Sequence, residues 1–561
     1  MRVEAGDVRA GLVSWAVRLA RARIYWCNVC RLRVHYHDVV SGVSRSLSRG
    51  RGCPAMRILP MIVAFLAVAL LGAAPAPAAV DLPLIDAVKM ADSARVERLL
   101  AAGADVAEPQ GDGATALHWA AHGDQADLAR LLVAAGADVD AADDHGVTPL
   151  ALACLNASVA MVDLLLEAGA DPNVARTSGV TPLMIAARVG EIEVVRRLLR
   201  AGADSTTAEK TRGQTALMWA IAENQTQVAS VLLETGGGAT VRSRNGFTPL
   251  LFAAQQGNLD VARLLLSAGS DVSEAAPDGI GGDTNARALF KEDTEASALL
   301  VAIDSGHAEM AHFLIARGAD PNHHGAGRTP LHAAVQRQMP DVVRALVEAG
   351  ADPDVRLEKS LPLVSRRITQ DNGLTPTTVG STPFLLAASF GDVESMRILV
   401  EAGADPFLTA DDNTTALMVA AGADYVEGQD KYGVRSYPAY YETLQRRAFE
   451  ATKYSLELGL DVNAVNDAGQ TPLHGAVYMG GTLIAPYLVE QGAEMDVINL
   501  RGQTPWMVAA QGEYRAGSFY RHEETGEVLE MLGADTTLGF DLGRDFWAQL
   551  GMEDPTRRRR R

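Results

Sequence analysis

Short runs of apolar and small residues recur along this chain at a nearly constant interval. Five of them begin with Thr and start 33 or 34 residues apart: TALHWA at Thr115, TPLALA at Thr148, TPLMIA at Thr181, TALMWA at Thr215 and TPLLFA at Thr248. Self-similarity at a period of this length is typical of stacked repeats, in which each unit buries its apolar face on its neighbours. The pattern therefore predicts a solenoid of repeats.

The period continues toward the C-terminus with three longer intervals, which indicate insertions. Further runs of the same kind begin at Ser297, Thr329, Thr382, Thr415, Thr471 and Thr504. A degenerate first unit, residues 84–112, lacks the opening tetrapeptide but keeps VERLLAAGADV. We therefore expect twelve units.

One unit, residues 180–213, shows how the pattern specifies local structure. Thr181 suits a helix N-cap, and Pro182 suits the first helical position, where no backbone N–H is needed. Gly202 suits a helix end, because glycine tolerates a positive φ. A second helix before it carries apolar residues at helical spacing: Val194, Val195, Leu198 and Leu199. Both helices are too short to be stable alone, so each unit must pack on the next.

The units resemble the ankyrin repeat. The signature T-P-L-H-x-A-A is nearly intact at 329–335 and at 115–121, and the closing L-L-x-x-G-A-D is present at 198–204. The resemblance covers roughly residues 81–537 and extends to exported bacterial ankyrin-repeat proteins. It implies an all-α solenoid of helix–turn–helix units with hairpin-like loops, in which loop tips and first helices line a concave face. The signature His is replaced in several units, by Met184, Met218, Leu251 and Met418.

The region before the repeats has the layout of a secretory signal peptide. From Met56 there is one Arg, then an apolar run from Met61 to Gly72, then an Ala/Pro-rich end. We expect residues 56–79 to be the signal and residues 1–55 to be a non-native leader from an over-extended start. The expected location is periplasmic or secreted. The alternative is an inner-membrane anchor, because residues 58–80 carry no charge over a length that can span a bilayer.

Charge and cysteine content narrow the choice of partners. The first 57 residues hold eleven of the 50 Lys and Arg and three of the 69 acids, so the remainder carries a formal charge of −27. Such a body repels nucleic acid and anionic membranes. We therefore expect a basic or neutral protein partner, no nucleic acid, membrane contact only through an uncleaved signal, and a monomer. Cys154 is the one cysteine after residue 57 and occupies a small apolar position of the signature.

Insertions are the individual features of this chain. We place them near 274–296, 356–380, 422–452 and 511–525, and we take residues 538–561, which end in five Arg, as a C-terminal cap and tail. The first two read as irregular loops. The third contains many tyrosines and continues as a helix from Tyr440 onward. Tyrosine is enriched at interfaces, but these rings could equally cover the end of the solenoid. The tyrosines considered for binding are Tyr432, Tyr437, Tyr440 and Tyr441.

A second set of candidate binding residues lies in the turns between the two helices of each unit. These positions follow the paired alanines and are chemically mixed, while their neighbours stay apolar. That contrast is expected of partner-binding positions and also of exposed positions under no constraint. The set is His122, Asn156, Arg188, Glu223, Asn224, Gln255, Gln256, Asp304, Gln336, Arg337, Phe390 and Tyr478.

Enzymatic motifs are missing from the sequence. There is no Gly-rich phosphate loop, nucleophile elbow or HExxH, and Asp320, His323 and His324 lack the helix-fixed spacing of a metal site. We expect no catalytic residue, cofactor or metal, and we predict a non-catalytic scaffold that binds a protein on its concave face and loop tips. The alternatives are a secreted effector acting on another organism's proteins and a periplasmic stress-protection protein.

Overall fold

The computed structural model describes residues 82–277, 295–325, 327–358, 379–423, 438–515 and 518–538. These residues form 24 helices in twelve consecutive pairs, as the repeat pattern predicts. The first helices of the pairs are α4 (Pro83–Lys89), α6 (Ala116–His122), α8 (Pro149–Leu155), α10 (Pro182–Val189), α12 (Ala216–Ala222), α14 (Pro249–Gln256), α16 (Ala298–Asp304), α18 (Pro330–Gln336), α20 (Pro383–Ser389), α22 (Ala416–Ala421), α24 (Pro472–Tyr478) and α26 (Pro505–Gln511). The second helices are α5 (Ser93–Ala101), α7 (Ala126–Ala134), α9 (Val159–Glu167), α11 (Ile192–Arg200), α13 (Thr226–Glu234), α15 (Leu259–Ser267), α17 (Ala308–Ala316), α19 (Pro340–Glu348), α21 (Val393–Glu401), α23 (Pro438–Glu457), α25 (Ile484–Glu490) and α27 (Glu523–Leu532).

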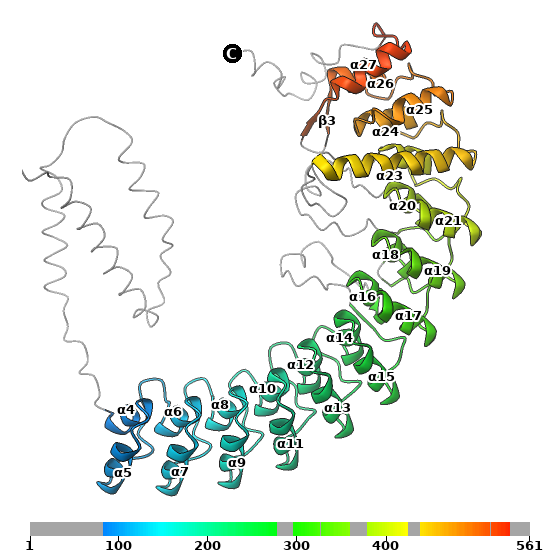
Figure 1. Cartoon of the computed structure of the whole chain (residues 1–561). Coiled ribbons are helices and arrows are strands. Elements are labelled where there is room, and N and C mark those ends of the chain that lie inside the picture. Colours follow the sequence, from blue (N-terminus) through cyan, green and yellow to red (C-terminus); the bar gives the residue numbers. More distant parts are fainter. Residues whose placement is uncertain are drawn as a thin grey trace, which may run out of the picture. The chain divides into compact units, whose positions relative to one another are not determined.

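The helix pairs stack in two layers (Figure 1). Every first helix contacts the next first helix, from α4 to α26, and every second helix contacts the next second helix, from α5 to α27. One buried apolar cluster runs through the stack from Leu84 to Ala534. Each unit therefore covers its apolar face with its neighbours, and the predicted all-α solenoid is confirmed.

Local sequence explains where each helix begins and ends. The hydroxyl of Thr148 accepts a 3.2 Å hydrogen bond from the backbone N–H of Ala151, and Pro149 occupies the first turn of α8. At the other end of a unit, Gly202 follows α11 with a φ of 92°, a conformation that glycine adopts without a steric penalty. The same cap and stop frame most units, so the period in the sequence becomes a period in the backbone.

Buried histidines of the signature connect one unit to the next. The N–H of Thr115 donates to His118 Nδ1 at 3.1 Å, so the ring proton resides on Nε2, which donates to the carbonyl oxygen of Val147 at 2.9 Å. Burial lowers the pKa of His118, and it lowers the pKa of His474 to about 4 and that of His332 to about 3. These rings are therefore neutral, and those of His118 and His474 also bond to a backbone oxygen of the next unit.

A second connection between units runs through the third residue of each hairpin. Asn173 Nδ2 donates to the carbonyl oxygen of Gly202 at 3.0 Å, and its Oδ1 accepts the N–H of Asp204 at 2.8 Å. Asp140, at the same position of an earlier unit, only accepts, from the N–H of Asp171 at 3.0 Å. An amide thus makes two bonds to the next unit where a carboxylate makes one. Asn322 and Asn463 repeat the two-bond arrangement.

Two insertions form short antiparallel strand pairs, which the sequence did not predict. The base of the first insertion is a ladder between β1 (Ala275–Pro277) and β2 (Glu295–Ser297), not the irregular loop that we expected. The break in the last unit contains β3 (Glu513–Arg515) paired with β4 (Ser518–Tyr520). Period-2 signals over three residues are too short to recognise in a sequence, because pairing across the loop decides them.

The third insertion contributes a long second helix. α23 has 20 residues, whereas most second helices have nine, in agreement with the helical pattern from Tyr440 onward. α23 contacts α20 and α21 of the preceding pair, its own partner α22 and the following α25. Its extra turns therefore reach across several units.

No helix among these residues is long and apolar enough to cross a membrane. The leader, the expected signal at 56–79 and the tail from 539 lie outside the described residues.

Candidate functional site

The turns of units two to six expose a row of polar side chains, which we call the open row. Each turn joins a first helix to a second helix, so a rigid helix end positions each side chain. Most candidates from this part of the chain are exposed, and Gln255 is half-buried. The exposed members are His122, Asn156, Arg188, Glu223, Asn224 and Gln256.

Two members of the open row also have structural roles. Asn156 Nδ2 donates to the carbonyl oxygens of Ala121 and His122, at 3.0 and 2.9 Å, and so connects two units. Asn224 has a φ of 59°, a left-handed conformation that asparagine tolerates better than most residues. These structural roles already explain why asparagine occupies both positions, so we do not assign either one to a partner.

Two tryptophans beside the open row were missing from the predicted site. Trp119 and Trp219 are half-buried on α6 and α12. Lys89 Nζ lies 4.2 Å from the ring centroid of Trp119, and the Arg188 guanidinium lies 5.2 Å from that of Trp219. The signal was available in the sequence, since TALHWA and TALMWA place a tryptophan where most other units have a smaller aliphatic residue and one has Phe252.

In the middle units the candidate residues are partly occupied by internal contacts. The Asp304 carboxylate forms a two-point salt bridge with Arg328, whose side chain is only 7% exposed. Arg337 is exposed, and its guanidinium donates to the backbone oxygen of Asp304. Gln336 is half-buried at the end of α18. Asp304 is therefore a structural anchor, and only Arg337 among these residues projects from the surface.

The candidates near the C-terminus are covered, which corrects the prediction. Tyr478 is 2% exposed and its hydroxyl accepts from Gln470 Nε2 at 2.9 Å, so it cannot face a partner. Phe390 is half-buried and packs against the core. The turn after Tyr478 lies against α23, which sequence periodicity alone could not reveal.

Two side chains of α23 bond to these turns. Arg447 Nη2 donates to the backbone oxygen of Phe390 at 2.9 Å, and its Nη1 donates to Gln338 Oε1 at 3.3 Å. Gln445 Nε2 donates to the backbone oxygen of Gly480 at 2.9 Å. We call Arg447, Gln445 and these contacts the α23 brace. Tyr440 and Tyr441 belong to the first turn of α23, and Tyr432 and Tyr437 lie outside the described residues.

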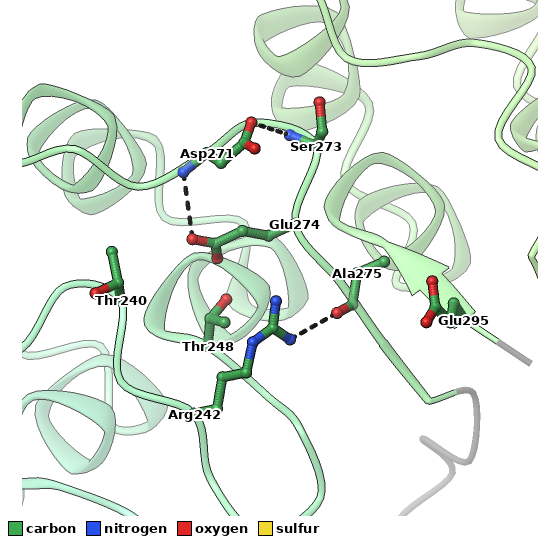
Figure 2. Close-up of a pocket in the computed structure, with 8 residues that line it drawn as sticks. All are labelled: Thr240, Arg242, Thr248, Asp271, Ser273, Glu274, Ala275 and Glu295. Atoms are coloured by element: carbon green, nitrogen blue, oxygen red, sulfur yellow. Dashed lines mark hydrogen bonds between the residues drawn. The ribbon is translucent and has the colours of Figure 1, made fainter. Parts of the chain in front are cut away.

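A pocket of about 510 Å³ lies between two consecutive hairpin loops, beside β1 (Figure 2). Its exposed rim includes Thr240, Arg242, Asp271 and Glu295, and its buried floor includes Glu274 and Thr248. Arg242 Nη1 donates to the backbone oxygens of Gly246 and Ala275, at 3.0 and 2.8 Å. The charged lining is thus three acids and one arginine that is held by carbonyl groups.

Glu274 is unusual among the pocket residues because it is buried and only partly hydrogen-bonded. It is 8% exposed, its Oε1 accepts the N–H of Asp271 at 3.2 Å, and its Oε2 is buried without a partner among the described residues. The sequence offered a signal here too, because several other units have a small or apolar residue at the same offset, among them Ala141, Val174, Val355 and Ala464.

Glu209, in another hairpin, is a buried carboxylate that is fully hydrogen-bonded to backbone N–H groups. It is 5% exposed and accepts the backbone N–H groups of Thr211, Arg212 and Gln214. Burial raises the pKa of Glu209, but these backbone hydrogen bonds outweigh burial and the net shift is downward. Glu209 therefore anchors its hairpin, whereas Glu274 retains one buried oxygen without a partner among the described residues.

Other potential chemistry has structural explanations. His323 Nε2 lies 3.1 Å from the backbone oxygen of Glu295, and His324 Nδ1 lies 3.4 Å from Glu358 Oε1. The described part of the chain contains no group of three His, Cys, Asp or Glu that could hold a metal ion. Cys154 is fully buried, and burial raises the pKa of its thiol, which makes it unreactive.

Comparison with known families explains the repeated architecture. A model of three tandem ankyrin repeats matches residues 84–176, 183–276 and 280–356. Models of many ankyrin repeats and of a single ankyrin repeat match residues 444–485 and 379–411. The chain belongs to the ankyrin-repeat family. None of these models describes a catalytic family.

Several curated proteins are similar to this ankyrin-repeat chain. Mouse "Ankyrin repeat and SOCS box protein 16" is 35% identical over 240 residues, which are 40% of this chain and 49% of that protein. Mouse "B-cell lymphoma 3 protein homolog" is 32% identical over 192 residues, which are 33% of this chain and 41% of that protein. The chain thus spans about half the length, or less, of these relatives. They are mouse proteins, and the bacterial, exported origin stays a prediction from the resemblance and from residues 56–79.

Proposed function

We propose that this ankyrin-repeat chain is a non-catalytic scaffold that binds a protein partner through the open row. One observation carries the proposal: exposed side chains of both charges stand on consecutive helix ends, next to half-buried tryptophans. Tryptophan and arginine dominate the energetics of protein interfaces, particularly where a polar rim surrounds an aromatic centre. The side chains that we assign to the interface are His122, Arg188, Glu223, Gln256, Trp119 and Trp219.

The fold suits recognition by a preformed surface. Each turn residue is fixed by a capped helix that packs on both neighbouring units. Binding therefore orders few side chains, and little conformational entropy is lost on association. The match to curated proteins named for their ankyrin repeats supports the same general role.

We further propose that the chain is exported and works in the periplasm or outside the cell. The support is the sequence from Met56, with its apolar run and Ala/Pro-rich end, which leads directly into the first repeat. Intact-mass analysis of the chain isolated from its native cells tests this. A mature N-terminus near residues 76–79 supports cleavage and export, whereas a chain that retains residues 58–80 favours a membrane anchor.

An affinity experiment tests the binding surface. The full chain and the double variant Arg188→Ala with Glu223→Ala are immobilised and exposed to an envelope extract of the native cells and to an extract of a second organism, and the captured proteins are identified. The matched control, Glu167→Ala with Arg200→Ala, removes the same charges from exposed ends of second helices. We expect one partner to bind the wild type and the control equally. Its affinity for the open-row variant should be about tenfold lower.

The partner's identity separates the remaining roles. Proteins of another organism would favour the effector role, and proteins of the same envelope would favour a structural or stress-protection role. Equal capture by all three chains would show that the open row is not the interface. Because the body carries a formal charge of −27, capture should weaken as salt is raised.

A further inference from the structure

The pocket between the hairpins of the fifth and sixth units contains an acceptor that no group of the described residues uses. Glu274 Oε2 is buried and has no hydrogen-bond partner, although its companion oxygen is bonded to the N–H of Asp271. Leaving a buried charged oxygen unpaired is unfavourable for folding. Figure 2 shows the side chain reaching across the pocket toward Thr240 and Thr248.

The charges around this oxygen define what can pair with it. Asp271 and Glu295 stand on the rim, so the pocket carries three acids against the single Arg242. Arg242 is directed to the carbonyl groups of Gly246 and Ala275 and forms no ion pair with these acids among the described contacts. An anionic ligand would meet repulsion from Glu274, whereas a cationic donor would satisfy it.

We propose that the pocket binds a lysine or arginine side chain of the protein partner. The inference rests on the proposed scaffold function and adds a second contact to it, on the hairpin edge. The cationic head pairs with Glu274 Oε2 in the floor, and its stem passes between Asp271 and Glu295 at the rim. A desolvated, charge-assisted hydrogen bond of this kind discriminates strongly against a neutral side chain. The acidic pocket also matches the basic partner that the acidic body favours.

Peptide selection with the full chain tests the proposal. A phage-displayed library of random peptides is selected on the wild type, and the recovered peptides are synthesised and measured by fluorescence anisotropy. We expect Lys or Arg to be enriched at one position. Affinity should fall at least about tenfold in Glu274→Gln, which keeps size and the bond to Asp271. The matched control is Glu108→Gln, at the same offset of the first unit, where the side chain is exposed.

A double-mutant cycle locates the contact. Replacing the selected Lys or Arg by norleucine should lower the affinity for the wild type as much as Glu274→Gln does, with no further loss when both changes are combined. Peptides without a basic preference, or with equal affinity for Glu274→Gln and wild type, would overturn the proposal. If such peptides still bind the wild type but no longer bind the Arg188→Ala, Glu223→Ala variant, the pocket proposal fails and the scaffold function stands.

A second measurement needs no ligand. Because Glu274 Oε2 has no partner among the described residues, Glu274→Gln should raise the midpoint of urea unfolding, whereas Glu108→Gln should leave it unchanged. A lowered midpoint for Glu274→Gln would make Glu274 a structural group like Glu209 and would reject the binding role.

Discussion

The turns of units two to six and those of units eight, nine and eleven follow the same sequence pattern but have different surroundings. In the first group, residues such as Arg188 and Glu223 are exposed. In the second group, Arg447 and Gln445 of α23 occupy the backbone acceptors of Phe390 and Gly480. One insertion therefore turns a potential binding row into an internal contact surface. A position in a repeat predicts exposure only while its neighbours are also regular repeats.

Acid should produce the largest loss of stability. His332 and His474 belong to the covered group, and burial lowers their pKa to about 3 and about 4. In the unfolded chain the pKa is about 6.5, so only the unfolded state takes up protons as the pH falls below that value. Stability that is complete at pH 7.5 should fall by about 2 kcal/mol per histidine at pH 5.

Urea unfolding at pH 7.5 and pH 5 measures this loss. The variant His474→Asn should remove about half of the loss of unfolding free energy that His332 and His474 together cause between pH 7.5 and pH 5, by the same proton linkage. His145→Asn, which alters an exposed hairpin residue, is the control and should show the same pH-dependent loss of stability as the wild type. If His474→Asn and the wild type lose the same unfolding free energy between pH 7.5 and pH 5, the His474 ring is not a neutral tie.

The N-terminal half should be most sensitive at its hairpins, because its turns are open. Replacing Glu209 by Ala leaves the N–H groups of Thr211, Arg212 and Gln214 without their acceptor. We expect a loss of about 3 kcal/mol in the free energy of unfolding. Glu108→Ala, in an exposed hairpin, should change it by less than about 0.5 kcal/mol. Urea unfolding compares the two, and similar losses would contradict the anchoring role.

Removing the brace tests the comparison directly. Arg447→Ala deletes the bonds to Phe390 and Gln338, and we expect a loss of about 2 kcal/mol. Arg188→Ala, in the open row, removes only a contact with Trp219 and should cost about 0.5 kcal/mol. Hydrogen exchange should speed up in α18 to α21 for the first variant alone. Unchanged exchange there would show that α23 does not hold these turns.

The smallest effect concerns the hairpin edge, which both halves share. Burial, together with the charges of Asp171 and Asp138, raises the pKa of Asp140, although the N–H of Asp171 opposes this. Asp140→Asn removes the like charge and adds a donor for the next unit, as Asn173 has. We expect a gain of about 0.5–1 kcal/mol in unfolding free energy. The reverse change, Asn173→Asp, should lower the unfolding free energy by a similar amount. A gain in unfolding free energy for both variants would refute the two-bond explanation.

The candidate site was only partly readable from the sequence. The turn residues of the open row followed from the offset after the paired alanines, and the structure exposes most of them. Tyr478 and Phe390 failed the same rule because α23 packs over their turns. Trp119 and Glu274 were missed, although Trp119 is larger, and Glu274 more polar, than the residue that most other units have at the same position.

The sequence by itself determined the repeat. Threonine caps, prolines at the first helical position, glycines after the second helix and apolar spacing are all local, so they specify twelve helix pairs without knowledge of distant residues. The tertiary structure decided what depends on contacts between units: the strands at the insertions, the side chains that α23 covers, and the unpaired oxygen of Glu274. Burial and hydrogen-bond partners are supplied by other units and by insertions, which no single repeat encodes.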